Sequence, residues 1–436
     1  MYPTNGTEIK KLAFFCYNVY MYKYRLLVAF LFTIVFFTIT PVTFAKNAYP
    51  WWEIQSVDTM KFSRDISRQV LEDPKAFEKS IDTQVKNIAD LGATHIGIAT
   101  PYDDEFLPVM NLWVYTARKY GLSIWFRGNF SGWEEWFGYE QITREEHLEK
   151  TRSFIIKHPG LFEDGDFFSP CPECENGGPG DPRFTQDVRG HRNFLIAEHT
   201  VAKQSFKEIG KRVDTSLNSM NGDVARLIMD PDTTRELGGI VTIDHYVKTP
   251  EQLIRDTREI AQSSQGLIFF GELGVPIPDI HGTMSQKEQA DWIADVFFRL
   301  ALEEKVIGIN YWVNMDSSTA LWDEFGKPKE AVAVVRSYFK PRVIEGTVVS
   351  NDKKPLVDAT IKGQYRLTHT DQKGKFALPI LPADKEISVF AQDHRSKKIT
   401  LAKGDSYSVT LLSSQSGLLH QFFDKIRDLV PDWIWR

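Results

Sequence analysis

The sequence has few cysteines and no surplus of positive charge. Only three of its 436 residues are cysteine, and because Cys16 lies close to the N-terminus, the rest of the chain holds one pair, Cys171 and Cys174. Two thiolates cannot complete a structural zinc site, which takes about four ligands. The formal net charge of -6 gives no basic patch of the kind that nucleic acids bind, so we expect no nucleic-acid partner.

Motifs that bind common cofactors are also missing. The chain contains no G-x-G-x-x-G fingerprint for a dinucleotide, and no H-E-x-x-H or H-x-H spacing that would make His245 a metal ligand. We therefore expect no cofactor and no metal.

The N-terminal segment has the pattern of an export signal. Lys23 and Arg25 precede an apolar run over residues 26–40, and small residues up to Ala45 come just before Lys46. We expect residues 1–45 to be an N-terminal extension with a signal peptide or an uncleaved anchor, and the mature chain to start near Lys46. In either case the rest of the chain faces an extracellular or periplasmic space. Residues 26–44 could also associate with a membrane.

Residues 46–340 alternate short β-rich runs with longer amphipathic stretches. We place strands near 54–60, 94–99, 123–127, 166–169, 215–218, 239–244, 267–272 and 308–313. Eight such β/α units predict a protein of the α/β class, a (β/α)8 TIM barrel. Because chemistry in such barrels occurs where strands end, the candidate site residues are sought there.

The sequence changes character after Pro341. Short alternating segments separated by turns predict a small all-β sandwich over residues 341–413. Residues 414–436 contain apolar side chains at helical spacing and predict a C-terminal amphipathic helix. Residues 418–436 could dock onto the barrel or rest on a membrane, and the mixture of acidic and basic residues on the polar face favours docking.

Carboxylates stand at the ends of several predicted strands. Glu173 follows strand 4, Asp244 ends strand 6 and Glu272 ends strand 7. A carboxylate at the tip of a barrel strand is costly to bury, so it is usually retained for function.

These residues make the chain resemble the large clan of retaining (β/α)8 glycoside hydrolases that includes cellulases, mannanases and β-galactosidases. The resemblance implies that Glu173 is the acid/base and Glu272 the nucleophile. It also implies that His245 and Tyr246 form the pair after strand 6, and that Trp312 is a sugar platform. The most specific match is the run over residues 308–331, with Tyr-Trp-Val-Asn-Met-Asp near its start.

The C-terminal module has a resemblance of its own. The segments Glu-Gly-Thr-Val-Val from residue 345, Pro-Leu-Val-Asp-Ala-Thr-Ile from 355 and Thr-Asp-Gln-Lys-Gly-Lys-Phe from 370 resemble the transthyretin-like regulatory domain that is appended to carboxypeptidases. This resemblance implies an accessory module without catalytic residues.

One position departs from the glycoside hydrolase pattern. The clan usually has Asn before the acid/base, in contact with the sugar 2-hydroxyl, whereas this chain has Pro172. Asn129 and Asn218, which follow strands 3 and 5, are the candidates for that contact. Glu175 competes with Glu173 for the acid role.

Aromatic and basic residues near strand ends have two interpretations each. Trp133 and Trp136 are candidate sugar subsites, or they pack the loop. Arg127 and Arg64 could each hold the nucleophile ionised, or form a structural salt bridge.

The two cysteines flank Glu173. In an exported chain Cys171 and Cys174 are expected to form a disulfide that stiffens the loop carrying Glu173. A thioredoxin-like redox motif is the rival interpretation, although the surrounding Pro and Gly residues indicate a loop and not a helix.

Together these features predict an exported glycoside hydrolase that cleaves a β-linked poly- or oligosaccharide with retention. In that mechanism one carboxylate attacks the anomeric carbon, and a second, about 5 Å away, protonates the leaving oxygen. The alternative from another class is a catalytically silent barrel that binds carbohydrate, and a disulfide oxidoreductase is a third hypothesis.

Overall fold

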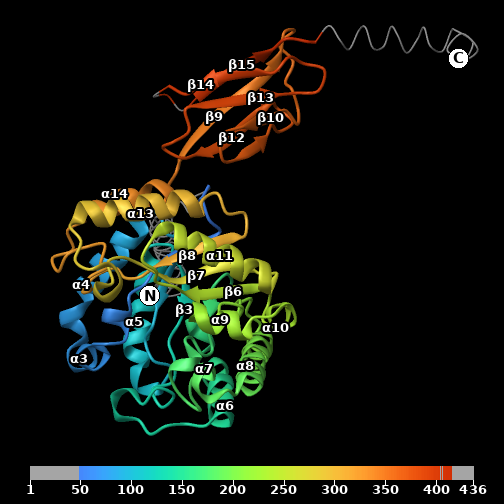
Figure 1. Cartoon of the computed structure of the whole chain (residues 1–436). Helices are drawn as coiled ribbons and strands as arrows, with labels where there is room; N and C mark the ends of the chain where they lie inside the picture. The colour runs from blue at the N-terminus through green and yellow to red at the C-terminus, as the bar shows by residue number, and fades with distance from the viewer. Residues whose placement is uncertain (1–48, 403, 405, 415–436) are drawn as a thin grey trace, which may run out of the picture. The chain divides into compact units, whose positions relative to one another are not determined.

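The computed structural model describes residues 49–402, 404 and 406–414, and eight short parallel strands form the centre of its larger part (Figure 1). The strands are β1 (Ile54–Val57), β2 (His95–Ile98), β3 (Ser123–Phe126), β4 (Phe167–Phe168), β5 (Ser219–Asn221), β6 (Ile240–Asp244), β7 (Leu267–Leu273) and β8 (Val306–Tyr311). Strands β2, β3 and β4 pair in one sheet, and β1, β8, β7, β6 and β5 pair in another.

Two single bridges join these sheets into a closed barrel. Asp58, just after β1, pairs in parallel with Gly97 on β2, and Phe167 on β4 pairs with Asp214 ahead of β5. The strand order around the barrel is therefore the order along the chain, which confirms the predicted (β/α)8 barrel.

Helices surround the strands (Figure 1). They are α2 (Met60–Ser63), α3 (Ser67–Glu72), α4 (Pro74–Leu91), α5 (Leu107–Lys119), α6 (Arg144–Lys157), α7 (Pro182–Thr185), α8 (Val188–Glu208), α9 (Gly222–Ile228), α10 (Pro231–Glu236), α11 (Pro250–Ser264), α12 (Pro278–His281), α13 (Gln286–Leu300) and α14 (Glu330–Phe339), with 3-10 turns η1 (Asp104–Phe106), η2 (Trp136–Gly138), η3 (Pro159–Leu161) and η4 (Cys174–Asn176).

Several helix ends follow directly from local sequence. Capping boxes begin α6, through Thr143 and Glu146, and α13, through Ser285 and Glu288. Gly92 ends α4 in the left-handed conformation with φ 98°. Such signals act over a few residues and define where these helices begin and end.

The fifth strand differs from the prediction. We expected it at 215–218, whereas β5 begins at Ser219. The Asp214 side chain accepts a hydrogen bond of 2.8 Å from the Ser216 backbone N–H, and Asn218 N–H donates to the Ser216 carbonyl. Side-chain bonds of this kind compete with a strand ladder, so the chain turns here before the strand begins.

The smaller part is a β-sandwich with its own apolar core. Its strands are β9 (Arg342–Ser350), β10 (Thr360–Lys362), β11 (Leu367–His369), β12 (Lys375–Ile380), β13 (Glu386–Phe390), β14 (Lys397–Thr400) and β15 (Ser406–Leu411). They form a four-stranded sheet, β11-β10-β13-β14, and a three-stranded sheet, β12-β9-β15. Strands β11 and β14 are short, and neither contributes a fully buried apolar side chain, although Ile399 of β14 packs against the core.

Two predictions lie outside the described residues: the signal or anchor within 1–45 and the helix within 414–436, of which only residue 414 is described. Within the described part of the chain, no helix combines the length and apolar character that a membrane span requires.

Candidate active site

Three acidic side chains from different strands converge at the carboxyl end of the barrel. Glu272 lies on β7, Asp244 ends β6, and Glu173 follows β4 immediately before η4. Each offers a carboxylate oxygen, and these three oxygens all lie within 4.8 Å of one another. Residues separated by about 100 positions therefore share one site.

A β-bulge between β6 and β7 directs the side chains of Asp244 and Glu272 toward each other. Ile243 pairs with Phe270, but the next residue, Asp244, pairs with Glu272, so Gly271 is an extra residue in β7. A β-bulge of this kind re-aims the side chain that follows it. A Cβ atom at position 271 would lie only 2.3 Å from Asp244 Oδ1, so glycine makes room for the Asp244 carboxyl group.

Arg127 is the positive partner of the cluster. It is 2% exposed, and its guanidinium donates to Glu272 Oε1 at 2.7 Å and to Asp58 Oδ2. The Tyr246 hydroxyl donates to Glu272 Oε2 at 2.8 Å. Both oxygens of Glu272 are thus held by donors, and Arg127, not Arg64, makes the ion pair with this carboxylate.

Burial and neighbouring charges move the acidity of both glutamates. Burial raises the pKa of Glu272 to about 7, opposed by Arg127 and helped by the negative charges of Glu173 and Asp58. Burial also raises the pKa of Glu173, while Arg127 lowers it and Glu175 raises it. Two neighbouring carboxyl groups whose pKa values are both raised suit acid/base and nucleophilic roles.

Glu173 is better placed than Glu175 to face Glu272. Glu175 is buried, and its Oε1 accepts hydrogen bonds from the Asn221 backbone N–H at 2.7 Å and the Asn221 side chain at 3.0 Å. Glu173 is held in the left-handed region with φ 46°, which is uncommon for a residue with a side chain and typical of functional loops.

The loop that carries Glu173 is cross-linked and packed from behind. Cys171 and Cys174 form a disulfide, with 5.2 Å between their Cα atoms. Trp133 donates from Nε1 to the Cys174 carbonyl at 3.1 Å, stacks on Phe194 and is 1% exposed. It therefore packs the loop, one of the two interpretations left open by the sequence, and offers no face for a sugar.

Asn129 belongs to a buried polar network. Its Oδ1 accepts from the Phe130 backbone N–H at 2.8 Å and lies 2.8 Å from His147 Nε2, while His147 Nδ1 lies 2.8 Å from Glu198 Oε1. This oxygen already serves two donors within the protein, so a contact of Asn129 with a sugar would have to come from its amide N–H groups.

The remaining predicted residues lie around the cluster in different situations. Asn218 is buried and donates to the Thr215 carbonyl at 3.3 Å. Trp136 and Trp312 are each partly exposed, with the Arg64 guanidinium 4.5 Å from the Trp136 ring centroid. His245 is buried, and its Nε2 faces Asp256 Oδ2 at 2.8 Å, on α11.

Three polar residues of the site were missed by the sequence analysis. Asp58 pairs with Arg127, and Asn310 on β8 donates to Asp58 Oδ2 at 3.1 Å. Glu134 is partly buried, and burial, with the charges of Glu173 and Glu175, raises its pKa to about 8. Asp58 and Asn310 lie within the predicted strands 1 and 8, so a search of these strands for polar residues would have found them. Glu134 lies in a loop and gave no such signal.

The three clustered carboxylates are also the kind of oxygen donors that bind a divalent cation. Here, however, Arg127 and Tyr246 each donate to one oxygen of Glu272, and the positive charge of the guanidinium beside that carboxylate would repel a cation. The residues present therefore fit a cluster whose negative charge is balanced by Arg127 better than they fit a metal centre.

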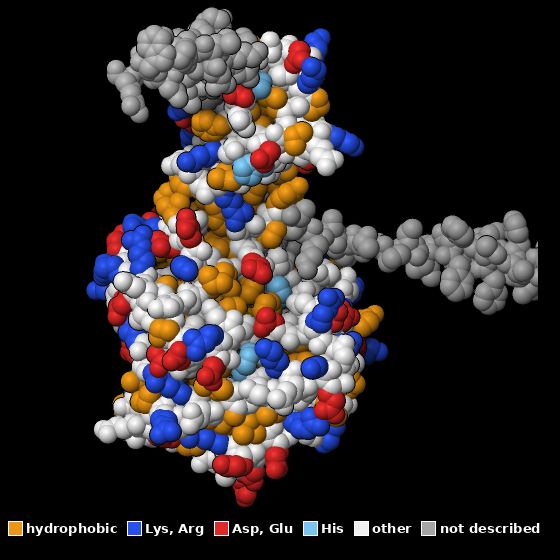
Figure 2. Space-filling model, turned by 90° about the vertical axis from the view of Figure 1, so that its right-hand side faces the viewer, with side chains coloured by type: hydrophobic (Ala, Val, Ile, Leu, Met, Phe, Trp, Pro, Cys, Tyr) orange, Lys and Arg blue, Asp and Glu red, His pale blue; other side chains and the backbone are white. Residues whose placement is uncertain are grey.

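A hollow of about 470 Å³ opens beside the cluster, at the ends of β5 and β6. Its lining includes Asp244, His245, Tyr246 and Asn221, and this volume suits a sugar-sized ligand. On the face shown in Figure 2, basic and acidic side chains are mixed over the described residues.

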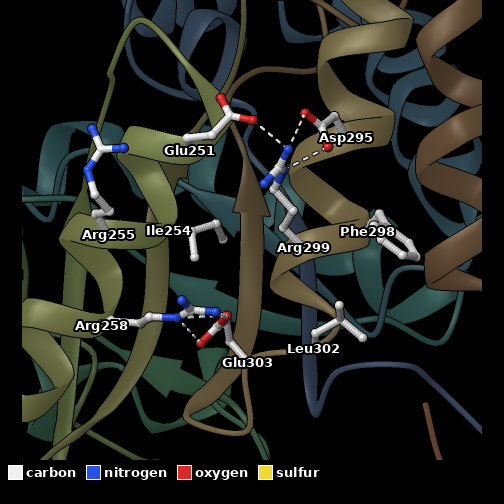
Figure 3. A pocket seen from close by; sticks show the side chains of 9 residues that line it. All are labelled: Glu251, Ile254, Arg255, Arg258, Asp295, Phe298, Arg299, Leu302 and Glu303. Atoms are coloured by element: carbon white, nitrogen blue, oxygen red, sulfur yellow. Dashed lines mark hydrogen bonds and ion pairs between the residues drawn. The ribbon is translucent and has the colours of Figure 1, made fainter. Parts of the chain in front are cut away.

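A second hollow, also of about 470 Å³, lies between helices α11 and α13 (Figure 3). Several of its charged residues pair with one another: Arg258 with Glu303 at 2.6 Å, and Arg299 with Asp295 at 2.7 Å. Because these helices form the outer layer of the barrel and the lining lacks the clustered carboxylates, this hollow is not the candidate active site.

Comparison with models of protein families finds no match, and neither does comparison with curated proteins. Solved structures do match. A GH5_18 protein from Bifidobacterium longum subsp. longum in complex with Manb1-4GlcNAc is 14% identical, with a TM-score of 0.50, covering 69% of this chain and 84% of that chain. A GH5_18 protein from Streptomyces cattleya with the same ligand is 12% identical, with a TM-score of 0.49, covering 68% and 84%.

A β-glucuronidase from Bacteroides uniformis is 10% identical, with a TM-score of 0.43, covering 82% of this chain and 46% of that chain. At these identities the likeness concerns the fold: the chain has the barrel that the Bifidobacterium glycoside hydrolase also has.

Proposed function

We propose that this chain is an exported glycoside hydrolase that cleaves a β-linked poly- or oligosaccharide with retention of configuration. The observation that carries the proposal is the approach of Glu173 and Glu272, whose nearest oxygens lie within 4.8 Å. Retaining enzymes hold their two carboxyl groups about 5–5.5 Å apart, whereas inverting enzymes need roughly 6.5–9.5 Å to admit a water molecule. The similar fold of a protein that binds Manb1-4GlcNAc, a β-linked sugar, supports the choice of substrate class.

In the proposed mechanism Glu272 is the nucleophile. Its ionised carboxylate, held by Arg127 and Tyr246, attacks the anomeric carbon, and the bond to the leaving oxygen breaks as Glu173 donates its proton to that oxygen. Glu173, now ionised, then removes a proton from water, which displaces Glu272 from the sugar. Loss of the Glu272 charge in the covalent intermediate lowers the pKa of Glu173, which favours its change from acid to base.

Covalent trapping tests the proposal most directly. A panel of 2-deoxy-2-fluoro aryl β-glycosides, whose intermediates hydrolyse slowly, should label the protein once, and peptide mass spectrometry should find the label on Glu272. The matched controls are Glu272→Gln, which should remain unlabelled and inactive while its circular dichroism spectrum shows a folded protein, and Glu175→Gln, which should still be labelled. Labelling at another carboxylate, or turnover by Glu272→Gln, would remove Glu272 from the mechanism.

The second candidate is a carbohydrate-binding barrel without turnover. It is favoured by Pro172 in place of the expected Asn, and by the engagement of the Asn129 amide oxygen in internal hydrogen bonds. Calorimetric binding of β-linked oligosaccharides without product release or labelling would support this candidate over the first.

We also propose that the signal is removed near Lys46 and that residues 341–413 form a transthyretin-like accessory domain. N-terminal sequencing of the secreted protein should begin close to Lys46. A chain ending at residue 340 should keep activity on small aryl glycosides. An intact N-terminus would instead indicate an anchor, and an inactive but folded truncation would give the sandwich a role in catalysis.

A further inference from the structure

Asp244 is the one carboxylate of the cluster without a partner. It is 3% exposed, yet neither of its oxygens has a hydrogen-bond partner among the described residues. The residue sits inside the sheet, paired with Asn221 on β5 and with Glu272 on β7. One of its oxygens lies within 4.8 Å of an oxygen of Glu173 and of Glu272, and Asp244 also lies at the edge of the hollow beside the cluster.

The surrounding charges disfavour an ionised Asp244. The charged groups that act on it are Glu272 on β7, Glu173 and Glu175 in the loop after β4, and Arg127 after β3. The guanidinium of Arg127 is already bound to both Asp58 and Glu272. An ionised Asp244 would be a buried charge beside two other carboxylates, which is costly unless the group is paired.

If Asp244 is protonated, no unpaired charge is buried, and the neutral carboxyl group has an O–H that can donate a hydrogen bond. The neighbouring acceptors are oxygens of Glu272 and Glu173, which together with one oxygen of Asp244 lie within 4.8 Å of one another. Glu272 is the register partner of Asp244, and each of its oxygens accepts a single hydrogen bond from Arg127 or Tyr246. Because a carboxylate oxygen has two lone pairs, Glu272 can accept a further hydrogen bond.

We propose that Asp244 is a positioning residue that stays protonated and donates a hydrogen bond to Glu272. Together with Arg127 and Tyr246, it gives the Glu272 carboxylate a third donor and fixes its orientation. Burial and the negative charges of Glu272 and Glu173, which raise the pKa of Asp244 well above its ordinary value, agree with this protonated state. The kinetic consequence rests on the proposed function, whereas the protonation state does not.

Two variants distinguish a requirement for a hydrogen-bond donor at position 244 from a requirement for a negative charge there. Asp244→Asn keeps the shape and a donor but cannot ionise, and Asp244→Leu keeps the volume but removes the donor. Thermal unfolding measured from pH 3.5 to pH 8 tests the protonation state without any substrate. Thr242→Val, a change of another buried β6 residue, is the matched control.

The expected sign follows from linkage. In the unfolded chain Asp244 ionises near its ordinary pKa of about 3.9, whereas in the folded protein it stays protonated to higher pH. Its contribution to stability is complete below about pH 4 and is lost as pH rises through the folded pKa. Asp244→Asn should therefore gain in melting temperature relative to the wild type as pH rises, while the offset of Thr242→Val should stay constant.

A relative loss by Asp244→Asn with rising pH would mean that Asp244 is ionised and paired, and would overturn the proposal. If that variant fails to fold, carbon-13 NMR of the wild-type protein with labelled aspartate reports the protonation state of Asp244 directly. One aspartate carboxyl should keep the chemical shift of a protonated acid at pH 7, and its absence would overturn the proposal.

Enzyme kinetics of the same two variants test whether Asp244 positions Glu272. Asp244→Asn should keep kcat/KM on an aryl β-glycoside within a few-fold, while Asp244→Leu should lower kcat at least 10-fold with less effect on KM. Equal, large losses in both folded variants would show that a negative charge is required, against the proposal. If the wild type hydrolyses no glycoside, the proposed function fails, while the pH dependence of unfolding still decides the protonation state of Asp244.

Discussion

Replacing Arg127 by methionine should damage both stability and the charge state of Glu272. The substitution keeps much of the side-chain length but leaves Asp58 and Glu272 buried without their cation. Breaking a buried ion pair in this way costs about 3–5 kcal/mol. With roughly 2–4 °C per kcal/mol for a domain of this size, the melting temperature should fall on the order of 10 °C.

The same change should move the pH dependence of activity. Arg127 lowers the pKa of Glu272, which with Arg127 present is about 7. Loss of an adjacent opposite charge raises a carboxyl pKa by about 1–3 units. At pH 7 the ionised fraction of Glu272 would then fall from about one half to about 10% or less, so kcat/KM should fall at least ~5-fold from this cause alone.

Asp58→Asn is the matched control because it should act in the opposite direction. The negative charge of Asp58 raises the pKa of Glu272, so its removal should move the acidic limb of the kcat/KM profile to lower pH, while Arg127→Met moves it to higher pH. The free-enzyme pKa is read from kcat/KM against pH on an activated aryl β-glycoside. Shifts in the same direction, or none in either folded variant, would refute Arg127 as the group that holds Glu272 ionised.

Three further predictions concern the loops around the site. Glu173→Ala should lose far less activity on aryl glycosides with activated leaving groups than on natural glycosides, because the former need little protonation, and equal losses would contradict an acid role. Cys171→Ser combined with Cys174→Ser should lower turnover with only a small shift in melting temperature, because so short a loop removes little chain entropy. Unfolding of this variant, or two free thiols in the unreduced wild type, would count against the disulfide's proposed role. Trp133→Ala should cost about 3–5 kcal/mol in unfolding measurements, whereas Trp136→Ala should raise KM for oligosaccharides at unchanged stability. The reverse pattern would exchange their roles.

Local sequence was enough to determine most elements of the barrel. Strand-like apolar runs, capping residues such as Thr143 and Ser285, and the terminating Gly92 act over a few residues, so their effects can be recognised without knowing the fold. The same holds for Glu272 as a candidate site residue, because a carboxylate at the end of an apolar run is unusual wherever the strand lies. The predicted position of the fifth strand was wrong because the turn made by Asp214 depends on one side-chain hydrogen bond.

Only the tertiary structure decided which of these residues share a site and in what state. The distance between Glu173 and Glu272 depends on closure of the barrel and on the bulge at Gly271. Arg127 had two interpretations in the sequence, and the structure shows that its one guanidinium bridges Asp58 and Glu272, two carboxylates far apart in the chain. Burial of Trp133 depends on contacts with η4 and α8. Sequence patterns report local backbone preference and periodic burial, whereas pKa, pairing and access are set by groups that the fold brings together from distant positions.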